Sequence, residues 1–305
     1  MQKLSYYKSH PEKMALRVLD RYFTWLPDKL YLKIKFRLAM GHRLNLKNPQ
    51  TFNEKIQWLN LYNRQQYCTD FADKYKAKQL VSQILGEQYV IPCFGVWEKF
   101  DDIDFDTLPE RFILKCNHDS GGYVICRDKK SFDVEAARKK LTKCLGRNYY
   151  TLAREWSYKN IPPKIFAEEY LENEAGKGLT DYKVWCFNGH AEYIKCIVGR
   201  LEGDLHEGFY NRDWELQDFT FTYPLLTKPV PKPERLEELI SCAEKLAHGI
   251  PFVRVDFYVL EDGSIRFGEM TFYPCAGLTK WMTESADLEM GKKITLDLTH
   301  KISGE

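Results

Sequence analysis

Two carboxylates near the C-terminal end of the chain have the spacing of metal ligands on facing β-strands. Residues 252–260 and 265–271 are rich in β-branched and aromatic residues, and they flank Asp262-Gly263, a dipeptide typical of tight hairpin turns. A two-residue turn would place Asp256 directly opposite Glu269. Oxygen ligands of this kind suit Mg²⁺, which usually takes one or two protein carboxylates and completes its shell with phosphate and water.

The same register brings further side chains to this face of the hairpin. Arg254 would lie opposite Thr271, where its guanidinium could stabilise negative charge during a reaction. Facing carboxylates near apolar neighbours need a counter-charge, which a divalent cation would supply. The alternative is an exposed face on which Arg254 pairs with Asp256. The face would continue into residues that look like core, namely Tyr258, Leu260, Ile265 and Phe267.

Residues 112–125 predict a strand, a glycine turn and a second strand. Lys115 lies at the end of the first strand. The turn offers backbone N–H groups that could approach a phosphate closely, from Ser120, Gly121 and Gly122. The alternative is an ordinary hairpin turn. His118, within this turn, would either touch phosphate or substrate or only shape the turn.

Two other acidic patterns are candidates for a site. Glu168 and Glu169 are adjacent on a predicted strand over 165–171, so their side chains point to opposite faces. One of them could accept hydrogen bonds from ribose hydroxyls, whereas the alternative is a strand whose glutamates face solvent. Residues 102–106 contain the Asp-x-Asp pattern with which glycosyltransferases hold a metal-bound sugar nucleotide. The alternative interpretation of these aspartates is an acidic surface connection.

The elements that must position these residues are helices in the first third of the chain and hairpins after it. Thr51 and Glu54 have the spacing of a capping box that opens a helix, and Ser131 is expected to cap a helix that runs to about Leu145. Asn188-Gly189 predicts a second tight hairpin. Further helices are expected over 11–25, 28–40, 71–85 and 234–247, further strands over 89–97, 111–116, 123–127, 182–187 and 191–198, and a polar loop over 172–180.

This order predicts an α+β fold and not the strand–helix alternation of a doubly wound sheet. Neither G-x-G-x-x-G nor G-x-x-x-x-G-K-[ST] is present, so a dinucleotide-binding fold and a P-loop are not supported. The net charge of +2 does not suggest a nucleic-acid partner. The nine cysteines form no C-x-x-C pair, and they are expected to be reduced core thiols.

The first ten residues lack an apolar run, and no stretch is long enough for a membrane span, so we expect a cytoplasmic protein. Residues 21–47 are basic and aromatic, which could indicate contact with a membrane surface. The alternative is a helical hairpin packed on the main body, with lysines in solvent.

Over residues 70–285 the chain resembles the ATP-grasp superfamily. It looks most like the branch associated with teichuronopeptide and surface-polysaccharide biosynthesis (TupA-like). The segments 52–59, 72–75 and 112–115 fit this branch. The specific feature is the pair 253–257 and 267–272, in which an Arg-x-Asp strand, a turn and a strand ending in Glu form the superfamily's metal-binding signature.

The resemblance implies an ATP-grasp fold, in which two α+β subdomains grip ATP, behind an N-terminal helical region. The implied regions are 1–70 (helical), 71–165 (first subdomain with the glycine loop) and 166–305 (second subdomain with the metal-binding hairpin). The implied nucleotide contacts are Lys74, Lys115, the Ser120, Gly121 and Gly122 loop, the hinge with Glu168, Glu169 and Leu171, and then Asp181 and Lys183.

The resemblance assigns Mg²⁺ to Asp256 and Glu269, with Thr271 as a third position, and catalytic contacts to Arg254 and Lys115. One position departs from the pattern, because Thr271 stands where many members carry asparagine. This departure leaves open whether the site would hold one magnesium ion or two.

The implied activity is that of an ATP-dependent carboxylate–amine ligase that works through an acylphosphate in capsule or cell-surface polysaccharide biosynthesis. Its partners would be ATP, a carboxylate-bearing acceptor such as a sugar acid, and an amine, without nucleic acid. The alternatives are an ATP-grasp phosphotransferase, a glycosyltransferase that uses the aspartates of 102–106, and a binding module without catalysis. Localisation is expected to be cytoplasmic, with membrane contact through the basic N-terminal helices as a further expectation.

Overall fold

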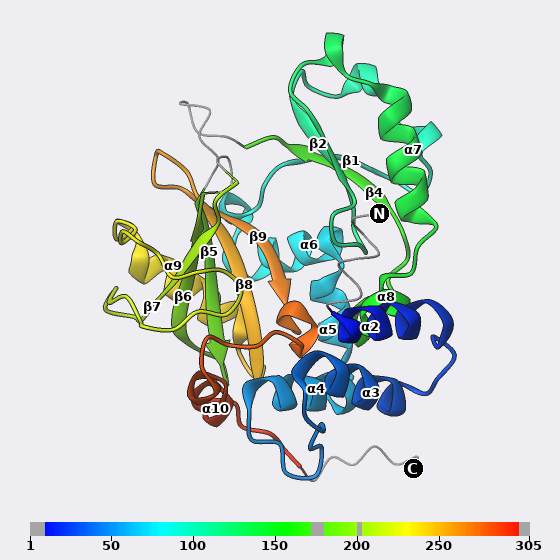
Figure 1. Ribbon diagram of the computed structural model, residues 1–305. Helices are drawn as coiled ribbons and strands as arrows, with labels where there is room; N and C mark the ends of the chain where they lie inside the picture. Colours follow the sequence, from blue (N-terminus) through cyan, green and yellow to red (C-terminus); the bar gives the residue numbers. More distant parts are fainter. Residues whose placement is uncertain (1–9, 172–179, 200–202, 299–305) are drawn as a thin grey trace.

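Two separate antiparallel sheets carry the strands, and helices surround them (Figure 1). The computed structural model describes residues 10–171, 180–199 and 203–298. One sheet has four strands in the order β1-β4-β2-β3, and the other has five in the order β7-β6-β5-β8-β9. All pairings within the two sheets are antiparallel, and the expected α+β class is confirmed.

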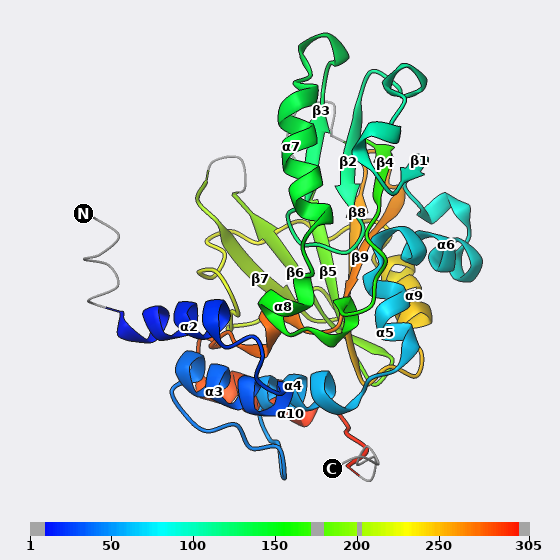
Figure 2. The same cartoon turned by 90° about the vertical axis from the view of Figure 1, so that its right-hand side faces the viewer.

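The four-stranded sheet consists of β1 (Cys93–Trp97), β2 (Phe112–Cys116), β3 (Tyr123–Cys126) and β4 (Ile165–Glu169). Helix α7 (Val134–Leu145) lies alongside it (Figure 2). The helix and the sheet share one apolar cluster, because every second residue of β2 points toward the helix. This cluster includes Phe112, Leu114, Ala137, Leu141 and Ile165.

The position of β4 bears on the division of the chain into regions. β4 pairs with both β1 and β2, so a boundary between residues 165 and 166 would separate this strand from its neighbours. The chain passes from one sheet to the other between Glu169 and Thr180. We keep the three regions as a proposal and move their second boundary to this connection. The polar loop expected over 172–180 lies, up to residue 179, outside the described residues.

Two helix starts differ from the expected ones. Helix α7 is capped by Asp133, whose carboxylate accepts a hydrogen bond from the Ala136 amide at 2.9 Å, whereas Ser131 lies in the short 3₁₀ helix η4 (Lys129–Ser131). Helix α6 (Lys74–Leu85) begins after Asp73 and is separate from α5 (Gln66–Ala72). In both cases an aspartate binds the free N–H groups of the first turn, and it thereby fixes the start.

The five-stranded sheet consists of β5 (Thr180–Phe187), β6 (His190–Val198), β7 (His206–Tyr210), β8 (Phe252–Val259) and β9 (Ile265–Thr271). Helix α9 (Leu236–Ala247) packs against β5, β6 and β8. The tight turn at Asn188 and Gly189 is confirmed, with φ of 50° and 86°. Both residues have the positive φ that such a turn requires.

The N-terminal helices are α2 (Pro11–Tyr22), α3 (Asp28–Met40) and α4 (Phe52–Tyr62). The capping box of Thr51 and Glu54 is confirmed at the start of α4. Phe52 is fully buried against aromatic residues of the second sheet, with the ring of Phe252 at 4.9 Å. Helix α4 is therefore part of the main core, and it also packs against α10 (Glu284–Lys292).

All nine cysteines are free, and seven of them are buried, as expected for reduced core thiols. Within the described ranges, no helix has the length and apolar character needed to cross a bilayer.

Candidate active site

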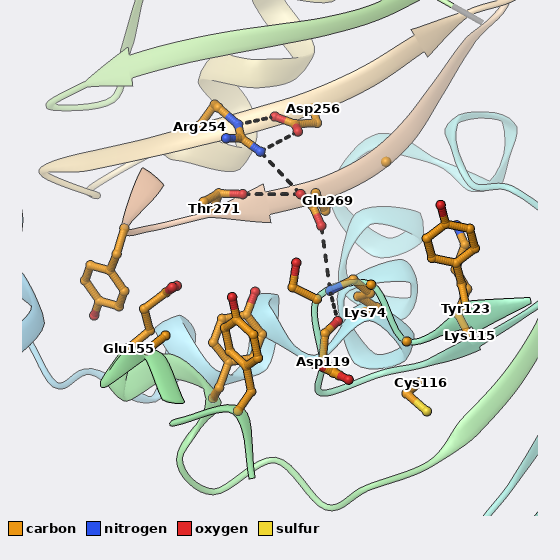
Figure 3. Close-up of a pocket in the computed structure, with 18 of the residues that line it drawn as sticks. Lys74, Lys115, Cys116, Asp119, Tyr123, Glu155, Arg254, Asp256, Glu269 and Thr271 are labelled. Atoms are coloured by element: carbon orange, nitrogen blue, oxygen red, sulfur yellow. Dashed lines mark hydrogen bonds and ion pairs between the residues drawn. The ribbon is translucent and has the colours of Figure 1, made fainter. Parts of the chain in front are cut away.

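A cleft of about 880 Å³ is lined by residues of both sheets. The second sheet contributes β5, β8 and β9, and the first contributes β2, β4, the turn that follows β2 and the start of β3. Helices α3 and α6 and the segments 149–158 and 273–276 complete the lining. The cleft therefore brings together residues that lie far apart in the sequence (Figure 3).

The β8–β9 hairpin confirms the predicted facing pair, but its turn differs from the expected one. Asp256 lies opposite Glu269, and Arg254 lies opposite Thr271. The loop has three residues and not two, because the Leu260 amide donates to the Ser264 carbonyl at 2.9 Å. A one-residue shift at the turn is cancelled by a β-bulge between Asp256 and Phe257.

The bulge changes which side chains share the face of Asp256. Phe257 pairs with Phe267, and both lie in the core on the opposite side of the sheet. The expectation that Phe267 and Ile265 continue the carboxylate face is therefore wrong, because the extra residue Gly268 reverses the alternation. Tyr258 does lie on that face and lines the cleft.

Gly268 is close to its neighbours in the bulge. A Cβ at this position would lie 3.1 Å from the Asp256 carbonyl oxygen and 3.3 Å from the Tyr258 ring. A larger residue would therefore have to push against the strand that carries Asp256.

Asp256 is buried between two basic side chains. Arg254 donates from Nε and Nη2 to the two carboxylate oxygens at 2.6 and 2.7 Å, and Lys183 donates to Oδ2 at 2.5 Å. Burial alone would raise the pKa of Asp256, but Arg254 and Lys183 outweigh it and hold this pKa below its ordinary value. The counter-charge expected from a divalent cation is therefore already supplied at Asp256 by Arg254 and Lys183.

Glu269 is held much less tightly. Its side chain is 37% exposed, and its oxygens lie 3.3 Å from Arg254 Nη2 and 3.6 Å from Lys74 Nζ. The Thr271 hydroxyl donates to it at 3.5 Å. Figure 3 shows Glu269 pointing into the cleft toward Lys74.

These hard oxygen donors fit Mg²⁺ that completes its shell with phosphate and water. They do not form a full protein cage, because the described residues contain no group of three metal-ligating side chains. Glu269 would be the main ligand, and Asp256 would have to share its oxygens with Arg254 and Lys183.

A second charged cluster lies where β4 meets α6. Glu168 is buried and forms ion pairs with Lys78, at 2.7 Å, and with Lys115. Burial would raise the pKa of Glu168, but the two lysines hold this pKa below its ordinary value. Lys78 was not predicted, although it lies one helical turn after Lys74 on the same face of α6, a spacing that could have identified it.

The glycine turn after β2 lies at the cleft, and Ser120, Gly121 and Gly122 all line it. Gly121 has φ of 83°, and Lys74 Nζ donates to the Asp119 carbonyl at 3.1 Å. The turn is therefore attached to α6.

His118 belongs to the interior of this turn. It is buried and bonds to Asn117 and to the carbonyl oxygens of Cys144 and Arg147. Burial lowers the pKa of His118. It shapes the turn and does not line the cleft.

The remaining predicted residues separate into two groups. Asp181 and Lys183 line the cleft, with 3.4 Å between their charged atoms. Glu169 is exposed on β4 and, like Leu171, does not line the cleft. The aspartates of the glycosyltransferase alternative are exposed and outside the cleft, namely Asp102, Asp104 and Asp106.

Several cleft residues had no sequence signal that could have identified them. They come from segments without a motif, and only the fold brings them to the cleft. Lys35 was expected in solvent but is buried and paired with Asp20 at 2.9 Å. The others are Tyr149, Glu155, Tyr158 and Tyr273.

The sequence matches the family model described as TupA-like ATPgrasp over residues 54–295. This match includes most of α4, both sheets and every cleft element except α3. No curated protein matches the sequence.

Solved structures with similar folds include two bacterial enzymes. One is the N5-carboxyaminoimidazole synthetase from Staphylococcus aureus, with 16% identity, 71% of this chain and 50% of that chain covered, and a TM-score of 0.41. The other is the D-alanine–D-alanine ligase from Bacillus anthracis, crystallised with ATP, with 17% identity, 67% and 54% coverage, and a TM-score of 0.37. The chain spans about half the length of these structures.

Proposed function

The chain belongs to the TupA-like ATP-grasp family, and from that premise we propose that it is an ATP-dependent carboxylate–amine ligase of capsule or cell-surface polysaccharide biosynthesis. The two-sheet α+β architecture is then the ATP-grasp fold, and the cleft is the nucleotide site. The polysaccharide context is part of the proposal and rests on the family alone.

The observation that carries the proposal is the difference between Glu269, which faces Asp256 on the β8–β9 hairpin, and three other cleft carboxylates. Asp119, Glu168 and Asp256 each have a close basic partner. Glu269 has only long contacts and an open side toward the cleft. A metal ion that arrives with the nucleotide can therefore bind Glu269 without displacing a strong ion pair.

The basic side chains around Glu269 suit a triphosphate. Lys115, Lys183 and Arg254 line the cleft from the two sheets and Lys74 lines it from α6, and the N–H groups of the glycine turn lie at its edge. We assign nucleotide contacts to these residues and to Asp181, with Mg²⁺ held by Glu269, Asp256 and the Thr271 hydroxyl. The bound ion would supply neutralisation of phosphate charge.

The proposed roles of the hinge residues Glu168, Glu169 and Leu171 differ from those implied by the resemblance. Glu168 forms ion pairs with Lys78 and Lys115, so we propose that it positions these lysines for the phosphates. Glu169 and Leu171 lie outside the cleft lining, and adenine contact through them stays a proposal that depends on the connection between the sheets.

In the proposed reaction, a carboxylate of the acid attacks the γ-phosphate, which gives an acylphosphate and ADP. The neutral form of an amine then attacks the acyl carbon, phosphate leaves together with the proton that the nitrogen loses, and an amide forms. Arg254 and Lys115 are proposed to stabilise the charge that develops on the transferred phosphoryl group. Most of the rate enhancement would come from holding the reactants in line.

A trapping assay tests this reaction. The protein is incubated with Mg-ATP, hydroxylamine and one carboxylate at a time, from glucuronate, galacturonate and the amino acids. A ligase forms a hydroxamate that depends on both ATP and the acid, because hydroxylamine intercepts the acylphosphate. A stable phosphorylated product without hydroxamate would indicate a phosphotransferase instead, and consumption of a UDP-sugar would indicate the glycosyltransferase.

We further propose that the protein works in the cytoplasm at a membrane surface. Helices α2 and α3 and the connection between them expose large apolar side chains beside basic ones. Trp25 is 73% exposed and Tyr22 is 62% exposed, and Arg21, Lys33 and Arg37 are exposed near them in the sequence. Aromatic side chains beside lysine and arginine suit an anionic bilayer surface.

A further inference from the structure

Glu155 is a buried carboxylate that the proposed reaction does not yet use. It lies between α8 (Tyr149–Ala153) and η5 (Trp156–Tyr158), lines the cleft, and is 8% exposed. Among the described residues, its carboxylate has no hydrogen bond and no ion pair. A buried carboxylate without a partner is costly for folding, so its retention in a cleft indicates a ligand.

The backbone on both sides of Glu155 is fixed by one side chain. Asn60 Nδ2 donates to the Arg154 carbonyl at 2.8 Å, and the Trp156 amide donates to Asn60 Oδ1 at 2.9 Å. Arg154 adopts a left-handed conformation with φ of 58°. The position of Glu155 is therefore held by the core helix α4, as expected of a preorganised binding group.

The surroundings of Glu155 are aromatic. Tyr149 and Tyr158 line the same cleft, and their rings meet edge to face with 4.9 Å between centroids. Tyr273 also lines the cleft. Carboxylate oxygens accept hydrogen bonds from an ammonium group, and tyrosine faces attract it, so this combination suits an organic cation.

The cations of the cleft near Glu155 are engaged elsewhere. Lys74 contacts Asp119 and Glu269, Arg254 is bonded to Asp256, and Lys35 is paired with Asp20. Burial, and then the charge of Glu269, raise the pKa of Glu155 to about 8. Lys74, Arg254 and Lys35 act on the Glu155 carboxylate from a distance, and Lys74 Nζ lies 5.8 Å from the centroid of the Tyr158 ring. Among the described residues none of them pairs with this carboxylate directly, so the cationic group of a ligand could take that position.

We propose that Glu155, with the rings of Tyr149 and Tyr158, binds the ammonium group of the amine co-substrate. This inference rests on the proposed ligase function and names the class of its second substrate, a primary amine that carries a positive charge in solution and gives one proton to the Glu155 carboxylate before it attacks. Figure 3 shows Glu155 on the opposite side of Glu269 from Lys115 and Tyr123. The amine would therefore approach the phosphoryl end of the nucleotide from the side away from the Lys115 cluster.

Saturation-transfer NMR in the presence of Mg-ADP tests the inference with defined probes. The probes are ethylamine, L-alanine, L-lysine and glucosamine, and N-acetylglucosamine serves as the matched sugar without an ammonium group. The variants are Glu155→Gln, Tyr149→Leu, which changes a half-buried ring, and Glu237→Gln as a control at an exposed glutamate of α9 outside the cleft.

At least one amine probe should bind the wild type and Glu237→Gln, while N-acetylglucosamine should not bind. Affinity should fall at least about 10-fold in Glu155→Gln and several-fold in Tyr149→Leu, with Mg-ADP binding unchanged in all variants. If Glu155→Gln does not fold, Tyr149→Leu decides the result.

Equal amine binding in the wild type, Glu155→Gln and Tyr149→Leu would overturn the ammonium site. Failure of every amine to bind a protein that binds Mg-ADP would overturn it as well. Failure of the protein to bind Mg-ADP at all is a separate outcome, and it would overturn the proposed function.

Discussion

Asp256 and Glu269 face each other across two strands, yet their side chains have different surroundings. Asp256 is buried between Arg254 and Lys183, whereas Glu269 is partly open to the cleft. The first has a large role in the stability of the site, and the second is suited to bind a ligand. The two residues can therefore be separated by experiment, although they belong to one sequence motif.

Asp256→Asn is expected to lower the free energy of unfolding by about 3 kcal/mol, because it leaves two buried cations without their shared partner. Glu269→Gln should change it by less than about 1 kcal/mol, since the contacts of Glu269 are long and partly exposed. Urea unfolding of both variants measures the difference. Equal destabilisation by the two substitutions would contradict the distinction between them.

Gly268→Ala should destabilise the protein by about 2 kcal/mol and weaken nucleotide binding, because the added methyl group would press on the Asp256 carbonyl and the Tyr258 ring. Gly146→Ala is the control, because its Cβ would meet nothing closer than 3.8 Å. Urea unfolding and calorimetric titration with Mg-ATP measure the two effects. Wild-type behaviour of Gly268→Ala would show that the bulge does not require glycine.

Glu155 is expected to shape the pH dependence of stability. Its pKa is raised to about 8 from 4.5, so the folded protein keeps a proton that the unfolded chain loses. This contribution to stability is complete below about pH 4.5 and is lost as the pH rises to about 8. Urea unfolding at pH 5 and pH 8 should show a smaller decline in Glu155→Gln than in the wild type. An equal decline would mean that Glu155 does not titrate in this range.

At the scale of elements, local sequence patterns predicted the positions of a helix start and of two hairpin turns. The capping box at Thr51 and the turns at Asn188-Gly189 and Asp262-Gly263 mark real element ends. The prediction that Asp256 faces Glu269 assumed a two-residue turn, whereas the turn has three residues. The bulge at Gly268 restores the predicted pairing, because its extra residue shifts the register back by one. No periodic pattern in the sequence indicates an inserted residue of this kind.

The partner of Lys78 and the position of Glu155 show why the rest of the site could not be predicted. The spacing from Lys74 could have marked Lys78, but no local pattern indicates that β4 brings Glu168 to it. Glu155 lies in a segment without a motif, and it reaches the cleft only because Asn60 fixes the backbone around it. Both positions depend on contacts between segments that are distant in the sequence.

The hairpin of α2 and α3 carries a separate prediction about membrane contact. The wild type should co-sediment with vesicles of mixed phosphatidylserine and phosphatidylcholine but only weakly with phosphatidylcholine alone. The double variant Tyr22→Ser and Trp25→Ser should lose most of this binding, because the aromatic side chains that would enter the interface are removed. Met282→Ser is the control at an exposed apolar residue elsewhere. Unchanged binding of the double variant would exclude these helices as the contact.

At the scale of the whole molecule, the cleft depends on both sheets and on the helices beside them. The first sheet supplies Lys115, Glu168 and the glycine turn, and the second supplies Arg254, Asp256 and Glu269. Lys74, on α6, contacts groups from both sides. A nucleotide bound between the sheets would therefore connect them and stabilise the chain as a unit.

The most direct test of this account is thermal unfolding of the wild type and Glu269→Gln with Mg-ATP, with Mg-UDP-glucose and without ligand. Mg-ATP is expected to raise the melting temperature of the wild type, by an amount that increases with its concentration, and to have much less effect on Glu269→Gln. UDP-glucose is expected to have no effect on either protein. Stabilisation by UDP-glucose alone, or equal stabilisation of both proteins by Mg-ATP, would contradict a magnesium–nucleotide site at Glu269.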